Sequence, residues 1–338
     1  MSTTDTSVET PPPPPADGAP SRGWRPGSVE VLAAVLVLVV LFQVPISRAM
    51  SAPALQTWMT VFIAVVTQAM PFLVFGVVLS AVIAVFVPPS FFAKVLPSKP
   101  VLAVPVASAG GVVLPGCECA SVPVAGALIR RGVTPAAALA FLLAAPALNP
   151  IVLTATAVAF PNNPEMVVAR FLASLVVATV MGWLWLRLGR TDWMRPPARP
   201  SFEGEGRAAA FWGSVRHDTI HAGGYLVIGA MAAATLKAVV PAGWLQAVAD
   251  NPVLSVIGLA LLAVLLSICS EADAFVAASL SQFSLTSRLV FLVVGPMVDL
   301  KLFAMQAGTF GRSFAVRFAP ATFGVAILVS VVVGVILF

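Results

Sequence analysis

The sequence predicts an all-α polytopic membrane protein built from two inverted structural repeats, each with a broken or re-entrant helical hairpin. Three observations support this fold class. First, 59% of the 338 residues are hydrophobic and only 10% are charged, whereas soluble domains carry about 25% charged residues. Second, apolar runs recur at lengths near the ~20 residues that span a bilayer as a helix. Third, cysteine-bearing polar breaks interrupt two of these runs, one in each half of the chain.

The chain begins with a tail rich in proline. Residues 1–28 include five consecutive prolines and few apolar residues, so we expect this segment to be disordered. Residues 29–53 contain an apolar run from Val29 to Ile46, which we interpret as an extra N-terminal transmembrane helix followed by a loop. The alternative is a cleaved signal peptide, because small residues follow the run.

The rest of the chain divides into two membrane repeats, 54–188 and 216–338, joined by a polar linker at 189–215. Within the repeats we expect long apolar helices at 55–87, 134–160, 165–188, 216–240, 285–308 and 312–338. Two further segments, 101–131 and 252–283, carry the interruptions.

The two halves can be aligned on landmarks that occur in the same order. The aligned pairs are Gly76 with Gly229, Pro88 with Pro241, Cys119 with Cys269, Ser121 with Glu271, Pro146 with Pro296, and Asn149 with Asp299. Because glycine, proline and cysteine positions coincide in series, an internal repeat explains the match better than chance similarity between apolar helices.

The distribution of basic residues predicts the topology. If each cysteine segment enters and leaves on one side, and the N-terminus is cytoplasmic, fourteen Lys and Arg residues lie inside and two, Arg48 and Arg288, lie outside. Each repeat then has three crossings, so the halves are inverted relative to one another. A single tilted crossing at 101–131 remains the alternative. The basic residues behind the net charge of +5 are therefore explained by orientation in a membrane. We expect no nucleic-acid partner.

The interruptions carry the candidate site. Polar groups at membrane depth cost free energy, so they indicate function, and irregular backbone there must be buried or line a cavity. Thiolates suit soft or borderline centres such as Zn²⁺ or Cu(I), and by the same argument trivalent arsenic. The alternative is that the cysteines are inert buried residues. The candidate substrate-binding residues are Cys117, Glu118, Cys119, Cys269, Ser270, Glu271, Asp273 and Asn149, with the three cysteines as candidate metal ligands.

Charged residues inside other runs need partners or a wet cavity. Lys301 is expected to pair with Asp299, Asp273 or Glu271. Asp299 and Lys301 either couple transport to the movement of a proton or charge, or form a purely structural ion pair. Arg170, Arg317 and Lys237 are expected to extend to the membrane interface. His217 and His221, four residues apart, could bind a metal, but we favour an interfacial role.

Two segments resemble a known family: PGCECASVPVAGALIRRGVTPAAALAFLLAAPALNPIVL and CSEADAFVAASL…LVFLVVGPMVDLKL. They are similar to a large family of bacterial predicted permeases that includes efflux permeases for trivalent organoarsenicals such as methylarsenite. The similarity covers roughly residues 55–338. It implies a multi-pass permease of the bacterial inner membrane, with Cys117 and Cys119 as candidate ligands. Glu118 departs from the small residue usual between those cysteines, so a divalent metal such as zinc competes with an arsenical as substrate.

The leading hypothesis is a secondary transporter that exports a soft metal or metalloid species, without a bound cofactor and without enzymatic activity. Its partners are then the lipid bilayer, the small substrate and a possible accessory subunit. Two alternatives stay open. One is a zinc-like permease or the membrane subunit of a two-component permease. The other is an intramembrane thiol oxidoreductase that uses Cys117 and Cys119 as a redox pair.

Overall fold

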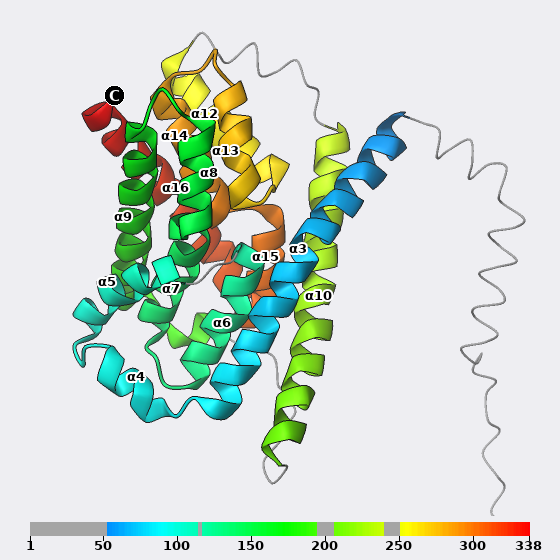
Figure 1. Cartoon of the computed structure of the whole chain (residues 1–338), viewed down its shortest axis with the longest axis vertical. Helices are drawn as coiled ribbons and strands as arrows, with labels where there is room; N and C mark the ends of the chain where they lie inside the picture. The colour runs from blue at the N-terminus through cyan, green and yellow to red at the C-terminus, as the bar shows by residue number, and fades with distance from the viewer. Residues whose placement is uncertain (1–52, 114–116, 195–205, 240–250) are drawn as a thin grey trace, which may run out of the picture. The chain divides into compact units, whose positions relative to one another are not determined.

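The computed structural model describes residues 53–113, 117–194, 206–239 and 251–338. Residues Pro53–Phe338 form one compact unit. The predicted tail, the first apolar run and the Pro115–Gly116 break lie outside the described residues. The described part of the chain is helical and contains no strand (Figure 1).

Six helical segments are long and apolar enough to cross a membrane, which confirms the six predicted segments. Four of them are single helices: α3 (Pro53–Phe86), α9 (Glu165–Leu188), α10 (Arg207–Val239) and α16 (Arg312–Leu337). The helix α10 begins well before the predicted position 216, so the polar linker between the halves is shorter than expected.

The other two long segments are each a pair of helices joined end to end. They are α7 (Pro135–Leu148) with α8 (Pro150–Ala159), and α14 (Leu285–Met297) with α15 (Leu300–Phe310). The second helix of each pair is capped by the residue at the break. Asn149 Oδ1 accepts from the Val152 amide at 2.9 Å, and Asp299 Oδ1 accepts from the Leu302 amide at 2.6 Å. The aligned residues Asn149 and Asp299 thus perform the same local task, because a capping oxygen satisfies an otherwise unpaired amide.

The interrupted segments form short helices. The first contains α5 (Pro100–Gly110), the 3₁₀ turn η1 (Gly111–Val113) and α6 (Glu118–Arg130), and the second contains α12 (Pro252–Leu266) and α13 (Ser270–Ser279). A surface helix, α4 (Pro89–Val95), precedes the first, and the short turn η2 (Thr191–Trp193) follows α9. Proline opens α4, α5 and α12, where its missing amide would be unpaired in any case.

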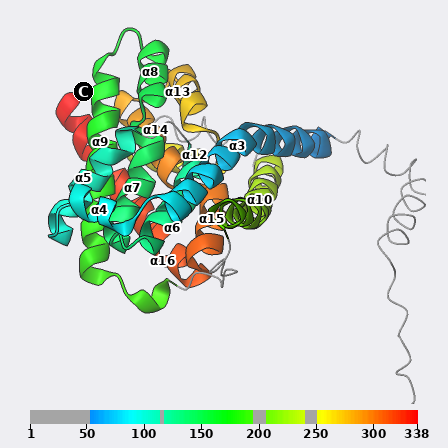
Figure 2. The same ribbon diagram turned by 60° about the horizontal axis from the view of Figure 1, so that its bottom comes forward.

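The two short helices that follow the cysteine-bearing breaks, α6 and α13, each pack against several other helices. Helix α6 contacts α3, α7 and α15, whereas α13 contacts α8 and α14. Each cysteine-bearing helix therefore packs against the second part of a broken helix from the opposite half of the chain. Figures 1 and 2 both show α8 beside α13 and α3 beside α10. In contrast, α3 and α10 contact α6 and α15, and neither packs extensively on the α8–α13 pair.

The close approach of α3 to α6 depends on Gly76. A Cβ at this position would overlap the backbone of Ala120, so any larger residue must push the two helices apart. We expect Gly76→Val to lower the free energy of unfolding by about 1–3 kcal/mol, measured by thermal unfolding in detergent. Gly224→Val is the matched control, since a Cβ at Gly224 would have no heavy atom within 4 Å. Equal melting temperatures of the two variants would contradict this account of the contact.

Candidate functional site

The three cysteines meet in the interior although Cys269 lies far from the other two in sequence. Cys117 and Cys269 occupy the extended positions immediately before α6 and α13, and Cys119 lies in the first turn of α6. All three are free thiols with at most 2% exposure. The Cys117 side chain interacts with those of both Cys119 and Cys269. The local structure pairs Cys117 with Cys269 as equivalent residues, whereas the sequence alignment paired Cys119 with Cys269.

Lys301 lies beside the thiols and is fully buried. Its ammonium group is 2.6 Å from Glu118 Oε1 and 3.2 Å from Asp299 Oδ2, and it donates to the Ser267 carbonyl at 2.7 Å. The pairing with Asp299 agrees with one of the predicted options, but Glu118 as the closest partner was not predicted. The contact with the Ser267 carbonyl is a hydrogen bond, and the contacts with the two carboxylates are ion pairs.

Ser267 has an unusual backbone conformation. Its φ of 47° and ψ of 38° place it in the left-handed region at the end of α12, which is uncommon for residues other than glycine. In this conformation the Ser267 carbonyl accepts a hydrogen bond from Lys301. The Ser267 Oγ atom accepts a second one from the Leu300 amide at 3.4 Å. The end of α12 is therefore tied directly to the start of α15. Such outliers persist where surrounding contacts hold them, often at functional sites.

A second buried ion pair joins α9 to α13. Arg170 is fully buried in α9, and its guanidinium is 2.9 Å from Asp273 Oδ2. The same group donates to Thr156 Oγ1 at 2.8 Å and to the Ser270 carbonyl at 3.2 Å. The prediction that Arg170 extends to the membrane interface is wrong, because α13 places a carboxylate within its reach. Arg317, in contrast, is exposed and lies over the Trp193 ring, 5.1 Å from its centroid.

The two ion pairs are reciprocal between the halves of the chain. Lys301 of the second half pairs with Glu118, in the first turn of α6, and Arg170 of the first half pairs with Asp273, in the first turn of α13. Each half thus supplies the cation that neutralises a carboxylate on the cysteine-bearing helix of the other half. Burial of either charge without its partner would cost several kcal/mol.

The remaining candidate residues occupy distinct places around this centre. Ser270 Oγ makes a long hydrogen bond of 3.5 Å to Glu118 Oε2. Glu271 is half-buried, and its Oε1 atom has no hydrogen-bond partner among the described residues. Asn149 caps α8 and is fully buried. The cluster contains four carboxylates (Glu118, Glu271, Asp273 and Asp299) against two cations.

The described residues contain no group of three or more His, Cys, Asp or Glu side chains arranged to hold a metal ion. The three thiols are in contact, but in this arrangement they do not form a ligand cage. His217 and His221 stack on α10 with ring centroids 5.8 Å apart, and His221 Nε2 lies 3.2 Å from the Gly308 carbonyl. These histidines line a cavity. They are separated along α10 from Gly229, the residue of this helix that packs against Lys301.

Sequence reasoning missed Arg170, Thr156 and Ser267 as parts of the site. Arg170 carried a usable signal, because an arginine in the second turn of an apolar helix needs a buried partner if it does not reach water. Asp273 was considered only as one of three possible partners of Lys301. Thr156 and Ser267 carried no such signal, because isolated hydroxyl residues are common in apolar helices and at their ends.

The Arg170–Asp273 pair gives a direct test of the buried network. We expect Asp273→Ala to destabilise the protein by about 3–5 kcal/mol, because it leaves the guanidinium buried without a counter-charge. Arg170→Met combined with Asp273→Leu should recover most of that loss. The exposed pair of Arg190 and Asp192, at 68% and 67% side-chain exposure, provides the control: Asp192→Ala should change stability by less than about 1 kcal/mol. Chemical unfolding in detergent measures all of these variants, and a stable Asp273→Ala protein would contradict the assignment.

Comparison with known proteins identifies the family of the chain. Residues 54–335 match the family described as "Predicted permease", ArsP_1. The chain is 36% identical over 262 residues to the UPF0718 protein YcgR of Bacillus subtilis (strain 168), covering 75% of this chain and 89% of that protein. It is 31% identical over 285 residues to the "Putative two-component membrane permease complex subunit" of Streptococcus mutans serotype c (strain ATCC 700610 / UA159), covering 82% and 95%. No solved structure matches the chain. The chain therefore belongs to this predicted-permease family of multi-pass membrane proteins.

Proposed function

We propose that this permease is a secondary transporter that exports a soft, thiol-binding metal or metalloid species, and that Cys117, Cys119 and Cys269 are its ligands. One observation carries the proposal: three free, buried thiols converge from two distant segments and are surrounded by charged side chains. Simple packing explains buried cysteines individually. It does not explain three buried carboxylates, the half-buried Glu271, a buried lysine and a buried arginine around them, because each such charge is costly in a membrane.

We further propose that the two halves are inverted repeats and that each cysteine segment is a re-entrant hairpin in the bacterial inner membrane. Several equivalences support this. Asn149 and Asp299 cap the second helix of the broken pairs, and Cys117 and Cys269 precede equivalent short helices. The packing of α6 on α15 corresponds to that of α13 on α8. Broken helices that meet at the interface of two repeats are characteristic of substrate sites in secondary transporters.

The charge beside the thiols favours a neutral substrate. The Lys301 ammonium interacts electrostatically with Cys119 and Cys269, so it opposes the binding of a divalent cation at the thiols, and Glu118 and Asp299 offset part of this effect. A trivalent arsenical is a neutral hydroxide near pH 7. When a thiol replaces a hydroxide on arsenic, the thiol proton leaves with the hydroxide as water, so the buried site gains no charge. A trivalent metalloid is therefore proposed as the preferred substrate, and zinc as the second candidate.

The other residues then have separate roles in the proposed cycle. Glu118 holds Lys301 beside the thiols and, with Asp299, compensates its charge. Glu271 carries a carboxylate oxygen without a hydrogen-bond partner among the described residues, which suits a group that exchanges a proton during transport. Ser270, Asp273 and Asn149 position the helices that hold the ligands.

A second candidate is that this chain is the membrane subunit of a two-component permease. The name of the Streptococcus mutans relative supports this possibility. Affinity purification of the tagged chain from its native membrane, without overproduction of any other protein, tests it. A second protein recovered in equal amount after stringent washing would support this candidate.

A thiol oxidoreductase with Cys117 and Cys119 as its redox pair is the rival from another class. It needs an electron acceptor within reach of the thiols. Membership in a permease family favours transport over this reaction. Cycling of a Cys117–Cys119 disulfide with added quinone would support the rival reading.

The first test of the transport proposal removes two ligands. We expect Cys117→Ser with Cys119→Ser to abolish protection of cells against trivalent arsenicals, because a serine hydroxyl does not replace a thiolate for a soft centre. Growth at graded arsenite, methylarsenite and zinc concentrations measures this at equal expression. Ser174→Ala, a substitution at a fully buried serine of α9, is the control. Undiminished protection in the double variant would refute the role of the thiols.

The second test concerns selectivity. Glu118→Gln with Lys301→Gln removes a cation and an anion together, so the buried charge balance is kept. We expect this variant to lose selectivity for a trivalent arsenical over Zn²⁺ by at least about tenfold, roughly 1.4 kcal/mol. Competition calorimetry on purified protein measures the ratio. Unchanged selectivity would show that Lys301 does not discriminate between the two substrates.

A further inference from the structure

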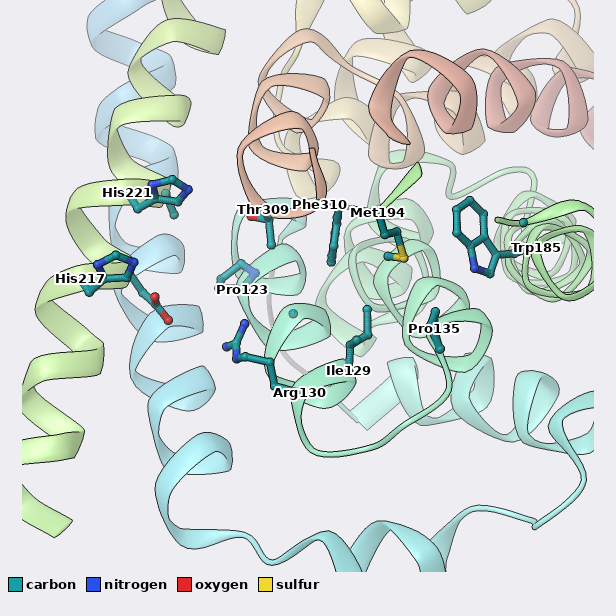
Figure 3. A pocket seen from close by; sticks show the side chains of 14 residues that line it. Pro123, Ile129, Arg130, Pro135, Trp185, Met194, His217, His221, Thr309 and Phe310 are labelled. Carbon is teal, nitrogen blue, oxygen red and sulfur yellow. The ribbon is translucent and has the colours of Figure 1, made fainter. Parts of the chain in front are cut away.

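A cavity of about 410 Å³ lies on the same side of the protein as the linker between the halves. It is enclosed by residues of α6, α7, α9, α10 and α15 together with Gly189 and Met194. Figure 3 shows His217 and His221 on one side of it and Trp185 on the other, with Arg130 between them. Its polar lining residues are Arg130, His217, Asp218, His221 and Thr309.

One wall of the cavity continues directly to the cysteines along α6. Pro123, Gly126 and Arg130 line the cavity. Together with Cys119 they follow a spacing of four, three and four residues, which places all four on one face of the helix. The face of α6 that carries Cys119 at its start is therefore the face that lines the cavity further on.

The other walls converge on Lys301 in the same way. On α15, Lys301, Met305 and Thr309 are spaced four residues apart, and Thr309 lines the cavity. On α10, His221 lines the cavity, and Gly229, two turns further on, meets Lys301. Three helices thus lead from the cavity to the thiols and the buried lysine.

Between the cavity and Lys301, α10 and α15 are in direct contact through glycines. The Tyr225 ring covers Gly308, and a Cβ added to Gly229 would lie 2.5 Å from Lys301 Cα. Tyr225 also packs edge-on against His221, with ring centroids 5.2 Å apart. Along both helices these contacts lie between the cavity-lining residues His221 and Thr309 and the buried Lys301. A separation of α10 from α15 would remove them.

We infer that this cavity is the linker-side vestibule of the transport route, and that the Tyr225–Gly308 and Gly229–Lys301 contacts form its inner gate. The ligand is the small hydrated species that the cysteine site takes, so the inference rests on the proposed function. A volume of about 410 Å³ gives room for a small solute with part of its hydration shell. Arg130 keeps the vestibule polar at neutral pH, because burial and the adjacent Arg131 lower its pKa only to about 10.

Cysteine labelling tests the vestibule. Thr309→Cys places a thiol in its lining. Ile220→Cys is the matched control, because Ile220 lies on α10 beside His221 but is 68% exposed on the outer face, where lipid would surround it. Asp192→Cys, at an exposed position of η2, reports which side of the membrane carries the linker. The native cysteines are buried, and the unsubstituted protein gives their background.

The probe is a charged, membrane-impermeant maleimide, applied to inside-out and to right-side-out vesicles. We expect Thr309→Cys to react from the same side as Asp192→Cys and about tenfold faster than Ile220→Cys, because a thiol must ionise in water to react. Added methylarsenite should slow the reaction at Thr309→Cys, and the labelled protein should lose transport. Labelling of Asp192→Cys should leave transport unchanged.

Two outcomes would overturn the inference. Thr309→Cys that reacts no faster than Ile220→Cys would show that water does not fill the cavity. Fully labelled Thr309→Cys that transports at the unlabelled rate would show that the cavity is not on the route. Side-specific labelling does not depend on knowing the substrate. A vestibule that labels as expected while the Cys117/Cys119 double variant still protects cells would therefore refute the proposed ligands and leave the vestibule standing.

Gly229→Ala tests the gate separately. The added methyl group must move Lys301 or the backbone of α15, so we expect the native cysteines to become several-fold more reactive to the same maleimide as the inner contact loosens. Gly224→Ala, on the same helix with open space where its Cβ would lie, is the control. Reactivity equal to that of the control, in a variant with unchanged melting temperature, would contradict the position of the gate.

Discussion

The interaction on which the middle of this structure depends is the set of three contacts made by the Lys301 ammonium. It joins the start of α6 through Glu118, the start of α15 through Asp299 and the end of α12 through the Ser267 carbonyl. Arg170 makes a comparable set of contacts from α9, to Thr156 of α8 and to Ser270 and Asp273 of α13. A buried ammonium is stable only while its partners stay in place. The positions of the three helix ends are therefore coupled to one another. A change in the charge at the thiols would alter the interactions of Lys301 and so act on all three ends.

The arrangement of the long helices adds an asymmetry to this centre. The pairs α6–α15 and α8–α13 correspond to one another in the chain, but α3 and α10 lie together against the first pair. If the halves are the inverted repeats proposed above, the equivalent second arrangement has α3 and α10 packed against α8 and α13 instead. Glycines at the contacts of α3 and α10 allow close approach there.

The sequence was sufficient to predict the six long helices, the two interrupted segments and the convergence of the cysteines. The helices follow from apolar length, and the pairing of Asn149 with Asp299 follows from their place after Pro146 and Pro296. The partners of the buried charges could not be predicted with the same success. Lys301 had several carboxylates within plausible reach, and only the packing of α6 on α15 selects Glu118. Arg170 was assigned to the interface because position along a helix does not reveal which neighbour faces it. The cavity beside α10 was not predictable, because its lining comes from five helices and two connecting segments.

The exchange of ion-pair partners between the halves has a consequence for biogenesis. Glu118 and Arg170 enter the membrane with the first half, before Asp273 and Lys301 have been synthesised. Until the second half arrives, two charged side chains in the bilayer lack their final partners, and insertion alone cannot complete the first half. Final packing of the early helices must wait for the late ones, so translation order and folding order differ in this chain. Expressed alone, the first half would be a substrate for membrane quality control. The protein becomes stable only when both halves are present.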